Sequence, residues 1–86
     1  MSNWCVYIVK CNDGSLYTGI TNNLDKRIST HNKGKGAKYT KTRLPVTLMA
    51  HCEASDRSEA SKEEYRIKKL TRVSKLALIC DWKRMS

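Results

Sequence analysis

The sequence contains no phenylalanine, a single proline and only four glycines. It also lacks a long hydrophobic run, since no stretch approaches the roughly 20 apolar residues that a membrane-spanning helix needs. The N-terminal stretch MSNWCVYIVKCND has no basic start and no long apolar core, so it is not typical of a signal peptide. We therefore expect a soluble, cytoplasmic protein with no membrane partner.

Acidic residues are scarce as well. Eight Asp and Glu face seventeen Lys and Arg, which gives a formal net charge of +9. Such a surplus suits a polyanionic partner, because each neutralised phosphate releases counterions. A merely solubilising surface is the alternative. The length of 86 residues and the 40% hydrophobic content predict one globular domain over residues 1–86.

The four cysteines form no CxxC pair and fit no zinc-binding spacing. Cys5, Cys11 and Cys52 stand in apolar, strand-like runs, where a reduced thiol often packs as a small core residue. We predict that these three are reduced and buried. A disulfide or metal role for the cysteines, Cys80 included, is the alternative.

The N-terminal third predicts a β-hairpin. Residues 4–11 and 15–20 are rich in β-branched and aromatic side chains, and Asn12-Asp13-Gly14 between them is a turn signal. A two-residue loop would place Tyr7 and Tyr17 on opposite faces of the sheet. A three-residue loop pairs Tyr7 with Gly19 and places both tyrosines on one face. We predict the three-residue loop.

The rest of the chain alternates between helical and extended patterns. Thr21-Asn22-Asn23 offers N-cap residues for a helix that ends before Gly34. Asp56, with Glu59 three residues later, is typical of a second helix start. We expect helices at residues 24–32, 56–70 and 74–80, a strand at 46–54, and a basic loop at 33–43.

Several residues could carry chemistry, and each also has an ordinary structural explanation. A tyrosine pair on a sheet face is usually core packing, although Gly19 leaves space beside it for a close approach. Arg27 shares an inward helix stripe with Leu24, so it needs either a structural carboxylate or a phosphate as partner. His31, one turn further, is either a structural residue or a general base.

Glu64 stands between apolar positions of the second predicted helix. It is either exposed at the edge of the stripe or held by a cation, and one carboxylate suffices for Mg²⁺ when water and phosphate complete the shell. The basic loop and the following helices offer phosphate and stacking contacts, or simply a solvated surface. The predicted nucleic-acid contacts are Lys33, Lys35, Lys38, Tyr39, Lys41, Arg43 and Lys68.

In their order along the chain, these residues resemble the GIY-YIG nuclease superfamily, and in particular its small stand-alone members. The resemblance covers residues 4–72 and rests on the following segments: Cys5-Val6-Tyr7, Tyr17-Thr18-Gly19, Arg27, His31, Gly34 to Thr40, Glu59-Ala60 and Glu64 to Lys68. It implies an α+β fold, with a three-stranded antiparallel sheet flanked by helices in the order strand–strand–helix–strand–helix–helix.

The resemblance also implies hydrolysis of DNA phosphodiesters with one divalent metal, Mg²⁺ or Mn²⁺. DNA is thus the expected partner, with RNA as an alternative. Tyr7 and Tyr17 would orient or deprotonate the attacking water, and Gly19 would permit close approach. Arg27 would stabilise the transition state, and His31 would assist the nucleophile. Glu64 would be the sole protein ligand of the metal.

Two positions depart from the family pattern. Cys5 replaces the first glycine of the first triplet, and Ile20 stands where some members carry a lysine beside the second triplet. The expected activity is that of an endonuclease with little sequence preference. The alternative is a basic nucleic-acid-binding module without catalysis, and an interaction protein for an acidic partner is a third possibility.

Overall fold

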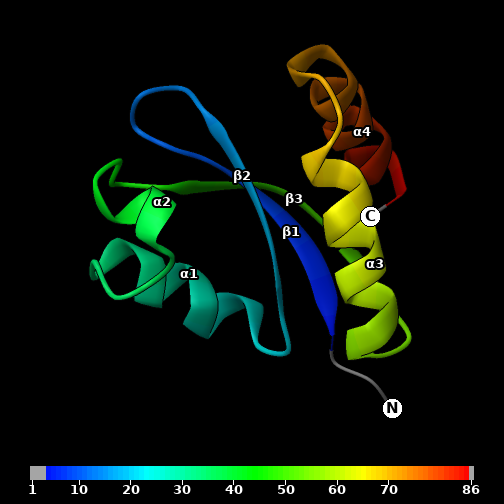
Figure 1. Ribbon diagram of the computed structural model, residues 1–86, viewed down its shortest axis with the longest axis horizontal. Helices are drawn as coiled ribbons and strands as arrows, with labels where there is room; N and C mark the ends of the chain where they lie inside the picture. Colours follow the sequence, from blue (N-terminus) through cyan, green and yellow to red (C-terminus); the bar gives the residue numbers. More distant parts are fainter. Residues whose placement is uncertain (1–3, 86) are drawn as a thin grey trace.

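A three-stranded antiparallel sheet forms the middle layer of the computed structural model, which describes residues 4–85. The strands are β1 (Cys5–Lys10), β2 (Leu16–Thr21) and β3 (Thr47–Glu53), and their order across the sheet is β2-β1-β3. Helices cover both faces of the sheet (Figure 1). The predicted α+β class is confirmed. Residues 1–3 and 86 of the predicted domain lie outside the described residues.

The β1–β2 hairpin has the predicted three-residue loop. Val9 pairs with Tyr17 and Tyr7 pairs with Gly19. The Cys11 amide donates to the Ser15 carbonyl at 2.8 Å, which closes the loop. Gly14 has φ +85°, the left-handed conformation that such a loop favours at this position. Because side chains alternate along a strand, this register places Tyr7 and Tyr17 on the same face.

β3 pairs with β1 through a local irregularity. The register shifts between Ile8 and Val9, because Ile8 pairs with Ala50 whereas Val9 pairs with Leu48. Met49 is therefore an extra residue on β3, as in a β-bulge. Met49 and Ala50 both pack against one face of the sheet, and Leu48 packs against the other. β3 thus contributes to both hydrophobic cores despite its half-exposed edge position.

The sheet separates two hydrophobic cores. On one face, Val6 and Ile8 pack with residues of the two C-terminal helices, including Ala60, Ile67 and Trp82. On the other face, Tyr7 and Val9 pack with Cys11, Val46 and the partly buried Leu24 and Ile28. Strand β1 is buried on both sides because it lies at the centre of the sheet, which explains its almost continuous apolar sequence.

The face that holds Tyr7 and Val9 carries α1 (Leu24–Asn32) and the short α2 (Lys38–Lys41). α1 starts where the sequence predicts, with Asn23 as N-cap accepting from the Lys26 amide. It ends before Gly34, which has φ +77°. The prediction that residues 33–43 form a loop throughout was wrong, because α2 lies within this segment. Thr40 is the buried residue of this single turn, and the composition of the segment does not predict that a helical turn forms here.

The opposite face, which holds Val6 and Ile8, carries α3 (Arg57–Lys68) and α4 (Arg72–Met85). Asp56 caps α3 as predicted, with its carboxylate accepting from the Glu59 amide at 2.9 Å. The predicted boundaries of the last helix were wrong at both ends. Thr71 Oγ1 accepts from the Ser74 amide, so the helix begins earlier. It also continues beyond Cys80, because Trp82 extends the buried stripe of Ile79 by one turn.

The cysteines are free, as predicted, but they are not equally buried. Cys5 and Cys11 are buried, Cys52 is only half-buried on the edge strand, and Cys80 is exposed on α4. The prediction that Cys52 is buried was therefore wrong. Among the described residues, no helix has the length and apolar character needed to cross a bilayer.

Candidate active site

Tyr7 lies at the centre of the candidate site. It stands in the middle of β1 and its side chain is fully buried. Its hydroxyl lies 2.8 Å from His31 Nε2 and accepts a hydrogen bond from Arg27 Nε at 3.3 Å. Arg27 and His31 are four residues apart on α1, so both side chains point from the same helix face toward the sheet. Three predicted site residues are therefore in direct contact.

Gly19 makes room for the Tyr7 ring. The two residues pair across β1 and β2, and the phenol lies over the glycine backbone. A Cβ atom built on Gly19 would lie 2.5 Å from the Tyr7 hydroxyl oxygen and 2.6 Å from Cζ. Both distances are too short for any side chain to fit without moving the ring. Gly19 thus leaves room for a close approach, and the group that occupies this room is the side chain of Tyr7.

His31 uses both ring nitrogens within the chain. Nε2 faces Tyr7, and Nδ1 lies 2.8 Å from Thr40 Oγ1 on α2. The imidazole and Thr40 are fully buried. From the sequence, His31 could be either a structural residue or a general base. With both nitrogens engaged in the free protein, the geometry gives it the contacts of an orienting group.

Burial controls the protonation of this pair. Loss of solvent raises the pKa of Tyr7, although the hydrogen bond from Arg27 lowers it in part, and Tyr17 and Glu64 add small increases. Burial lowers the pKa of His31, and the nearby Arg27 cation lowers it further. Both shifts favour the uncharged form. At neutral pH the site therefore holds a neutral phenol and a neutral imidazole beside one guanidinium.

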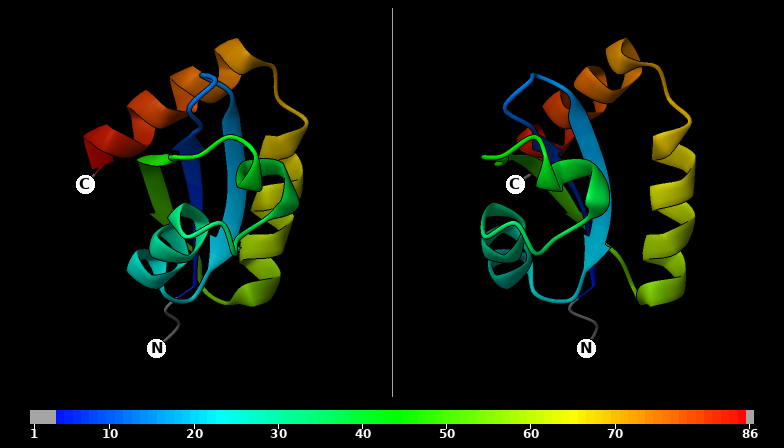
Figure 2. Two further views of the ribbon diagram at one scale, coloured as in Figure 1. Left: turned by 90° about the vertical axis from the view of Figure 1, so that its left-hand side faces the viewer. Right: turned by 60° about the vertical axis from the view of Figure 1, so that its left-hand side comes forward.

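Tyr17 borders the buried group on the solvent side and is half-buried on β2. Its ring meets the His31 ring edge-on, with 5.6 Å between centroids. The Tyr39 ring stacks on it at 5.9 Å, and Lys68 Nζ lies 5.4 Å from its centroid. Figure 2 shows how α2, which carries Tyr39, and α3, which carries Lys68, reach β2 from opposite faces of the sheet.

Glu64 reaches the same region from α3. Its carboxylate lies 3.4 Å from Lys68 Nζ, and its side chain is 25% exposed. It contributes to the raised pKa of Tyr7, although less than burial does. No group of three or more His, Cys, Asp or Glu side chains gathers within residues 4–85. A half-buried single carboxylate fits Mg²⁺, a cation that commonly keeps several waters and takes further oxygens from a phosphate.

Apart from Lys68, which pairs with Glu64, the predicted nucleic-acid contacts fall into two groups. Lys33, Lys35, Lys38 and Lys41 are exposed on the segment 33–43. Arg43 is held within the chain instead. Its Nε donates to Asp13 at 3.0 Å, and its guanidinium lies 4.0 Å from the centroid of the Tyr39 ring. Tyr39 is 41% exposed and stacked between Arg43 and Tyr17, so this arginine and this tyrosine fasten the segment to the hairpin.

Two residues of this region, Thr40 and Asp13, were not predicted from the sequence to contribute to the site. Thr40 was part of the quoted basic stretch, but its contact with His31 depends on the turn of α2. Asp13 was assigned only to the hairpin turn, where its carboxylate indeed accepts from the Ser15 amide. Its second contact, with Arg43, joins residues thirty positions apart and leaves no local signal. The pKa of Asp13 is lowered mainly by the Ser15 hydrogen bonds and also by Arg43.

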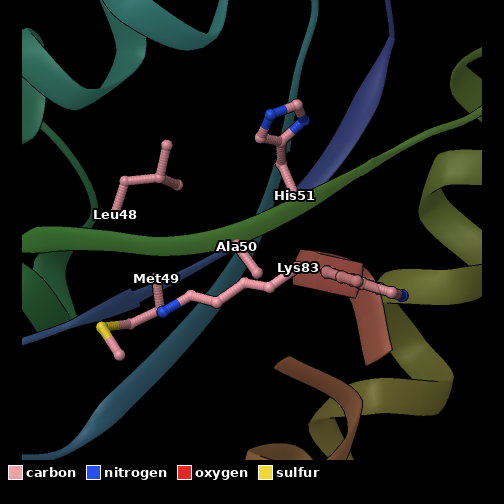
Figure 3. A pocket seen from close by; sticks show the side chains of 6 residues that line it. Leu48, Met49, Ala50, His51 and Lys83 are labelled. Atoms are coloured by element: carbon pink, nitrogen blue, oxygen red, sulfur yellow. The ribbon is translucent and has the colours of Figure 1, made fainter. Parts of the chain in front are cut away.

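A separate shallow pocket lies between β3 and α4. Figure 3 shows Leu48 and His51 on one side of the strand, and Met49, Ala50 and Lys83 on the other. The pocket contains none of the predicted site residues. Its lining is Leu48, Met49, Ala50, His51, Trp82 and Lys83. Its composition offers one imidazole and one ammonium group and thus provides no basis for placing the chemistry there.

Comparisons with known proteins identify the family. The family profile described as the GIY-YIG catalytic domain matches residues 3–77. A UPF0213 protein from Staphylococcus haemolyticus is 57% identical over 79 residues, which cover 92% of this chain and 96% of that protein. A UPF0213 protein from Desulfotalea psychrophila is 54% identical over 77 residues, covering 88% and 70% of the two chains.

Two solved structures are similar in fold. The solution NMR structure of a UPF0213 protein from Bacillus halodurans has a TM-score of 0.58 and 45% sequence identity, and the match covers 90% of this chain and 82% of that one. The solution structure of a protein from E. faecalis also has a TM-score of 0.58, with 38% identity and coverage of 91% and 88%.

Proposed function

Since the chain belongs to the GIY-YIG family, we propose that it is a metal-dependent endonuclease that hydrolyses DNA phosphodiester bonds with little sequence preference. GIY-YIG nucleases act on nucleic acid and generally depend on a divalent metal. For this chain we assign Mg²⁺ or Mn²⁺ as the metal and DNA as the main substrate, with RNA as a second candidate. The net charge of +9 supports a polyanionic substrate.

The observation that carries the proposal is the contact among Tyr7, His31 and Arg27 beside Tyr17. These residues come from three elements, and packing alone does not require their polar atoms to converge. Phosphoryl transfer is accelerated mainly by positioned cations and dipoles directed at developing charge. An arginine fixed by a buried phenol, next to a half-buried tyrosine and a carboxylate, supplies these components.

Burial decides the roles that we assign to the two tyrosines. Tyr7 is fully buried and its hydroxyl already has two partners, so we assign it to orient Arg27 and His31. Tyr17 borders solvent, so its hydroxyl would accept a hydrogen bond from the attacking water and direct the water oxygen toward phosphorus. Both residues thus remain in the site, but in this proposal only Tyr17 meets the reactants.

Arg27 would stabilise charge on the phosphoryl group. It is half-buried, and its Nε is the nitrogen that donates to Tyr7. The two Nη nitrogens make no such hydrogen bond within residues 4–85, so they would donate to phosphate oxygens. A guanidinium has the planar donor geometry for such bidentate contacts. His31 would act through Tyr7 by holding its hydroxyl in place.

Glu64 would hold the metal, which polarises the phosphate and stabilises the leaving oxygen when bound. In the free protein its carboxylate pairs with Lys68. Release of Lys68 would leave the carboxylate to the metal and let the ammonium group contact a phosphate. The exposed lysines of segment 33–43 would bind the flanking backbone.

A cleavage assay with matched glutamate variants tests the proposal. Labelled duplex, single-stranded and branched DNA, together with RNA, would be incubated with the protein in Mg²⁺, Mn²⁺ or EDTA. We expect cleavage that needs the metal and that Glu64→Gln lowers by at least about 100-fold, the size of effect seen when an electrostatic group is lost. Glu63→Gln is the control, since Glu63 pairs with Arg66 on the same helix.

Equal loss in both glutamine variants, or unchanged cleavage by Glu64→Gln, would reject the metal assignment. Salt-dependent binding of DNA without cleavage in any metal would instead support the binding module. Ile20, at the position where some family members carry a lysine, is the feature that motivates this second candidate.

A further inference from the structure

A continuous chain of hydrogen bonds runs through the candidate site to α2. Arg27 Nε lies 3.3 Å from the Tyr7 hydroxyl, which lies 2.8 Å from His31 Nε2. On the other side of the ring, His31 Nδ1 lies 2.8 Å from Thr40 Oγ1. The Thr40 hydroxyl then lies 3.0 Å from the carbonyl oxygen of Ala37.

The two ends of this chain favour one direction for the bonds between them. The Arg27 guanidinium has donors only, and the Ala37 carbonyl is an acceptor only. From one end, Tyr7 accepts from Arg27, so its proton is available for His31 Nε2. From the other end, Thr40 gives its proton to Ala37, so it accepts from His31 Nδ1. Together these directions favour a neutral imidazole whose proton is on Nδ1, because every proton in the chain then has an acceptor.

The other neutral tautomer breaks this arrangement. With the proton on Nε2, the Tyr7 oxygen would face two donors, and its own proton would have no acceptor in the chain. The Thr40 hydroxyl would have to turn its proton from the Ala37 carbonyl, which also accepts from the amides of Thr40 and Lys41, toward Nδ1. Because Tyr7, His31 and Thr40 are fully buried, water cannot replace the lost partners without rearrangement.

Close packing holds the imidazole against segment 33–43. A Cβ atom built on Gly36 would lie 2.8 Å from His31 Cγ, so the glycine backbone lies directly against the ring. The Tyr7 ring meets the imidazole on another side, with 5.9 Å between centroids and an interplanar angle of 66°. The ring therefore has little freedom to rotate and exchange its two nitrogens.

We propose that Thr40 is a positioning residue that holds His31 in the Nδ1–H tautomer and thereby fixes the Tyr7 hydroxyl that orients Arg27. The effect on cleavage rests on the function proposed above, whereas the tautomer does not. Segment 33–43 would accordingly have two roles. Its exposed lysines face the solvent, and the buried Thr40 on its inner side sets the hydrogen-bond direction of the site.

Nitrogen-15 NMR of the full chain tests the tautomer without any substrate. In the wild type at neutral pH, His31 is expected to show a protonated, pyrrole-type Nδ1 and an unprotonated, pyridine-type Nε2. Thr40→Ser keeps the hydroxyl and should keep this pattern. Thr40→Val replaces the hydroxyl with a methyl group, and its His31 is expected to shift toward the Nε2–H tautomer.

Thr18→Val is the matched control. Thr18 is also a buried threonine, but its hydroxyl has no hydrogen-bond partner among the described residues. This variant should leave the His31 signals unchanged. A wild-type ring protonated on Nε2 would overturn the proposal even if Thr40→Val fails to fold. So would a folded Thr40→Val protein that retains the wild-type tautomer.

The cleavage assay adds an independent readout. Thr40→Val is expected to lower cleavage by about 10- to 100-fold, as small displacements of catalytic groups do. Thr40→Ser should restore most of it. Wild-type rates in Thr40→Val, together with a changed tautomer, would show that the orientation of Tyr7 does not matter for the reaction. A wild-type protein that cleaves no substrate would reject the proposed function, whereas the NMR spectra would still decide the tautomer.

Discussion

Tyr7 pairs with Gly19 across the central hairpin, and its phenol ring occupies the space that any side chain at position 19 would need. The glycine therefore fixes where the Tyr7 hydroxyl lies, and through it the positions of His31 and Arg27. From the sequence, this position was expected to leave open space for a close approach. The structure fills it with the tyrosine that organises the site.

Gly19→Ala should displace this ring. The new methyl group would lie 2.5 Å from the Tyr7 hydroxyl oxygen, so the ring or the strand must move. We expect cleavage to fall by about 100-fold, and the free energy of unfolding to fall by about 1–3 kcal/mol, as overpacked cores do. Cleavage kinetics and urea unfolding would measure the two effects. An alanine variant with wild-type activity would contradict this account of Gly19.

Tyr7→Phe and Tyr17→Phe should differ in stability. Loss of the Tyr7 hydroxyl leaves buried His31 Nε2 and Arg27 Nε without this partner, so we expect a loss of about 1–3 kcal/mol in the free energy of unfolding. Tyr17 is half-buried, so its phenylalanine variant should lose less than about 1 kcal/mol. Both variants should lower cleavage. Equal stabilities of the two variants would argue against the distinction drawn from burial.

Acid should weaken the fold through His31. Its folded-state pKa lies below the ordinary value of 6.5, because burial and Arg27 disfavour the imidazolium. Below pH 6.5 the unfolded chain therefore binds a proton that the folded chain resists, and stability falls as the pH decreases toward the folded-state pKa. The expected slope is at most about 1.4 kcal/mol per pH unit. Urea unfolding between pH 7.5 and 5.5 would measure it.

An NMR titration of His31 checks the cause of this effect. The midpoint should lie below 6.5 in the wild type and should rise in Arg27→Gln, which removes the nearby cation. An unchanged midpoint in Arg27→Gln would leave burial as the only source of the shift.

Thr18→Val should stabilise the protein or leave it unchanged. The Thr18 hydroxyl is buried on β2 and has no hydrogen-bond partner within residues 4–85. Its replacement by a methyl group of similar size removes the cost of a dehydrated polar atom, about 1 kcal/mol. Thermal or urea unfolding would show the gain. A loss of more than about 1 kcal/mol would indicate that the hydroxyl has a partner, such as an internal water.

The cations of segment 33–43 should separate into binding and structural residues. Lys38→Ala with Lys41→Ala removes two exposed charges and should reduce the salt slope of DNA binding by up to about two. Arg43→Ala should mainly destabilise the fold, because Arg43 contacts Asp13 and the Tyr39 ring. Binding measured over a range of salt concentrations, with unfolding as the second readout, distinguishes the two. A lysine pair that changes stability but not binding would reverse this assignment.

Local sequence patterns predict the features of this fold that depend on near neighbours. The hairpin register follows from Asn12-Asp13-Gly14, and the starts of α1 and α3 follow from Asn23 and Asp56. The extent of α4 was missed, because Trp82 belongs to its buried stripe only once the helix packs on the sheet. α2 was missed as well, since the cause of its turn is tertiary.

The candidate site also combines features that follow from local spacing with features that depend on contacts between distant residues. Strand alternation and helix spacing bring Tyr7, Tyr17, Arg27 and His31 to one face of the sheet. The partner of His31 on α2 and the contact between Arg43 and Asp13 each join distant positions. Whether a polar side chain meets a substrate or another side chain depends on such contacts, and spacing alone does not specify them.

The position of β1 between two neighbouring strands has a consequence for the motions of the site. Amide protons of a central strand commonly exchange with solvent only when the whole domain unfolds, whereas a single helical turn opens at much lower free energy. Tyr7 is on the first kind of segment and Thr40 is on the second. Deuterium should therefore enter the α2 backbone long before it enters the β1 backbone. The contact between Thr40 and His31 would then break and re-form many times before the strand that carries Tyr7 opens once.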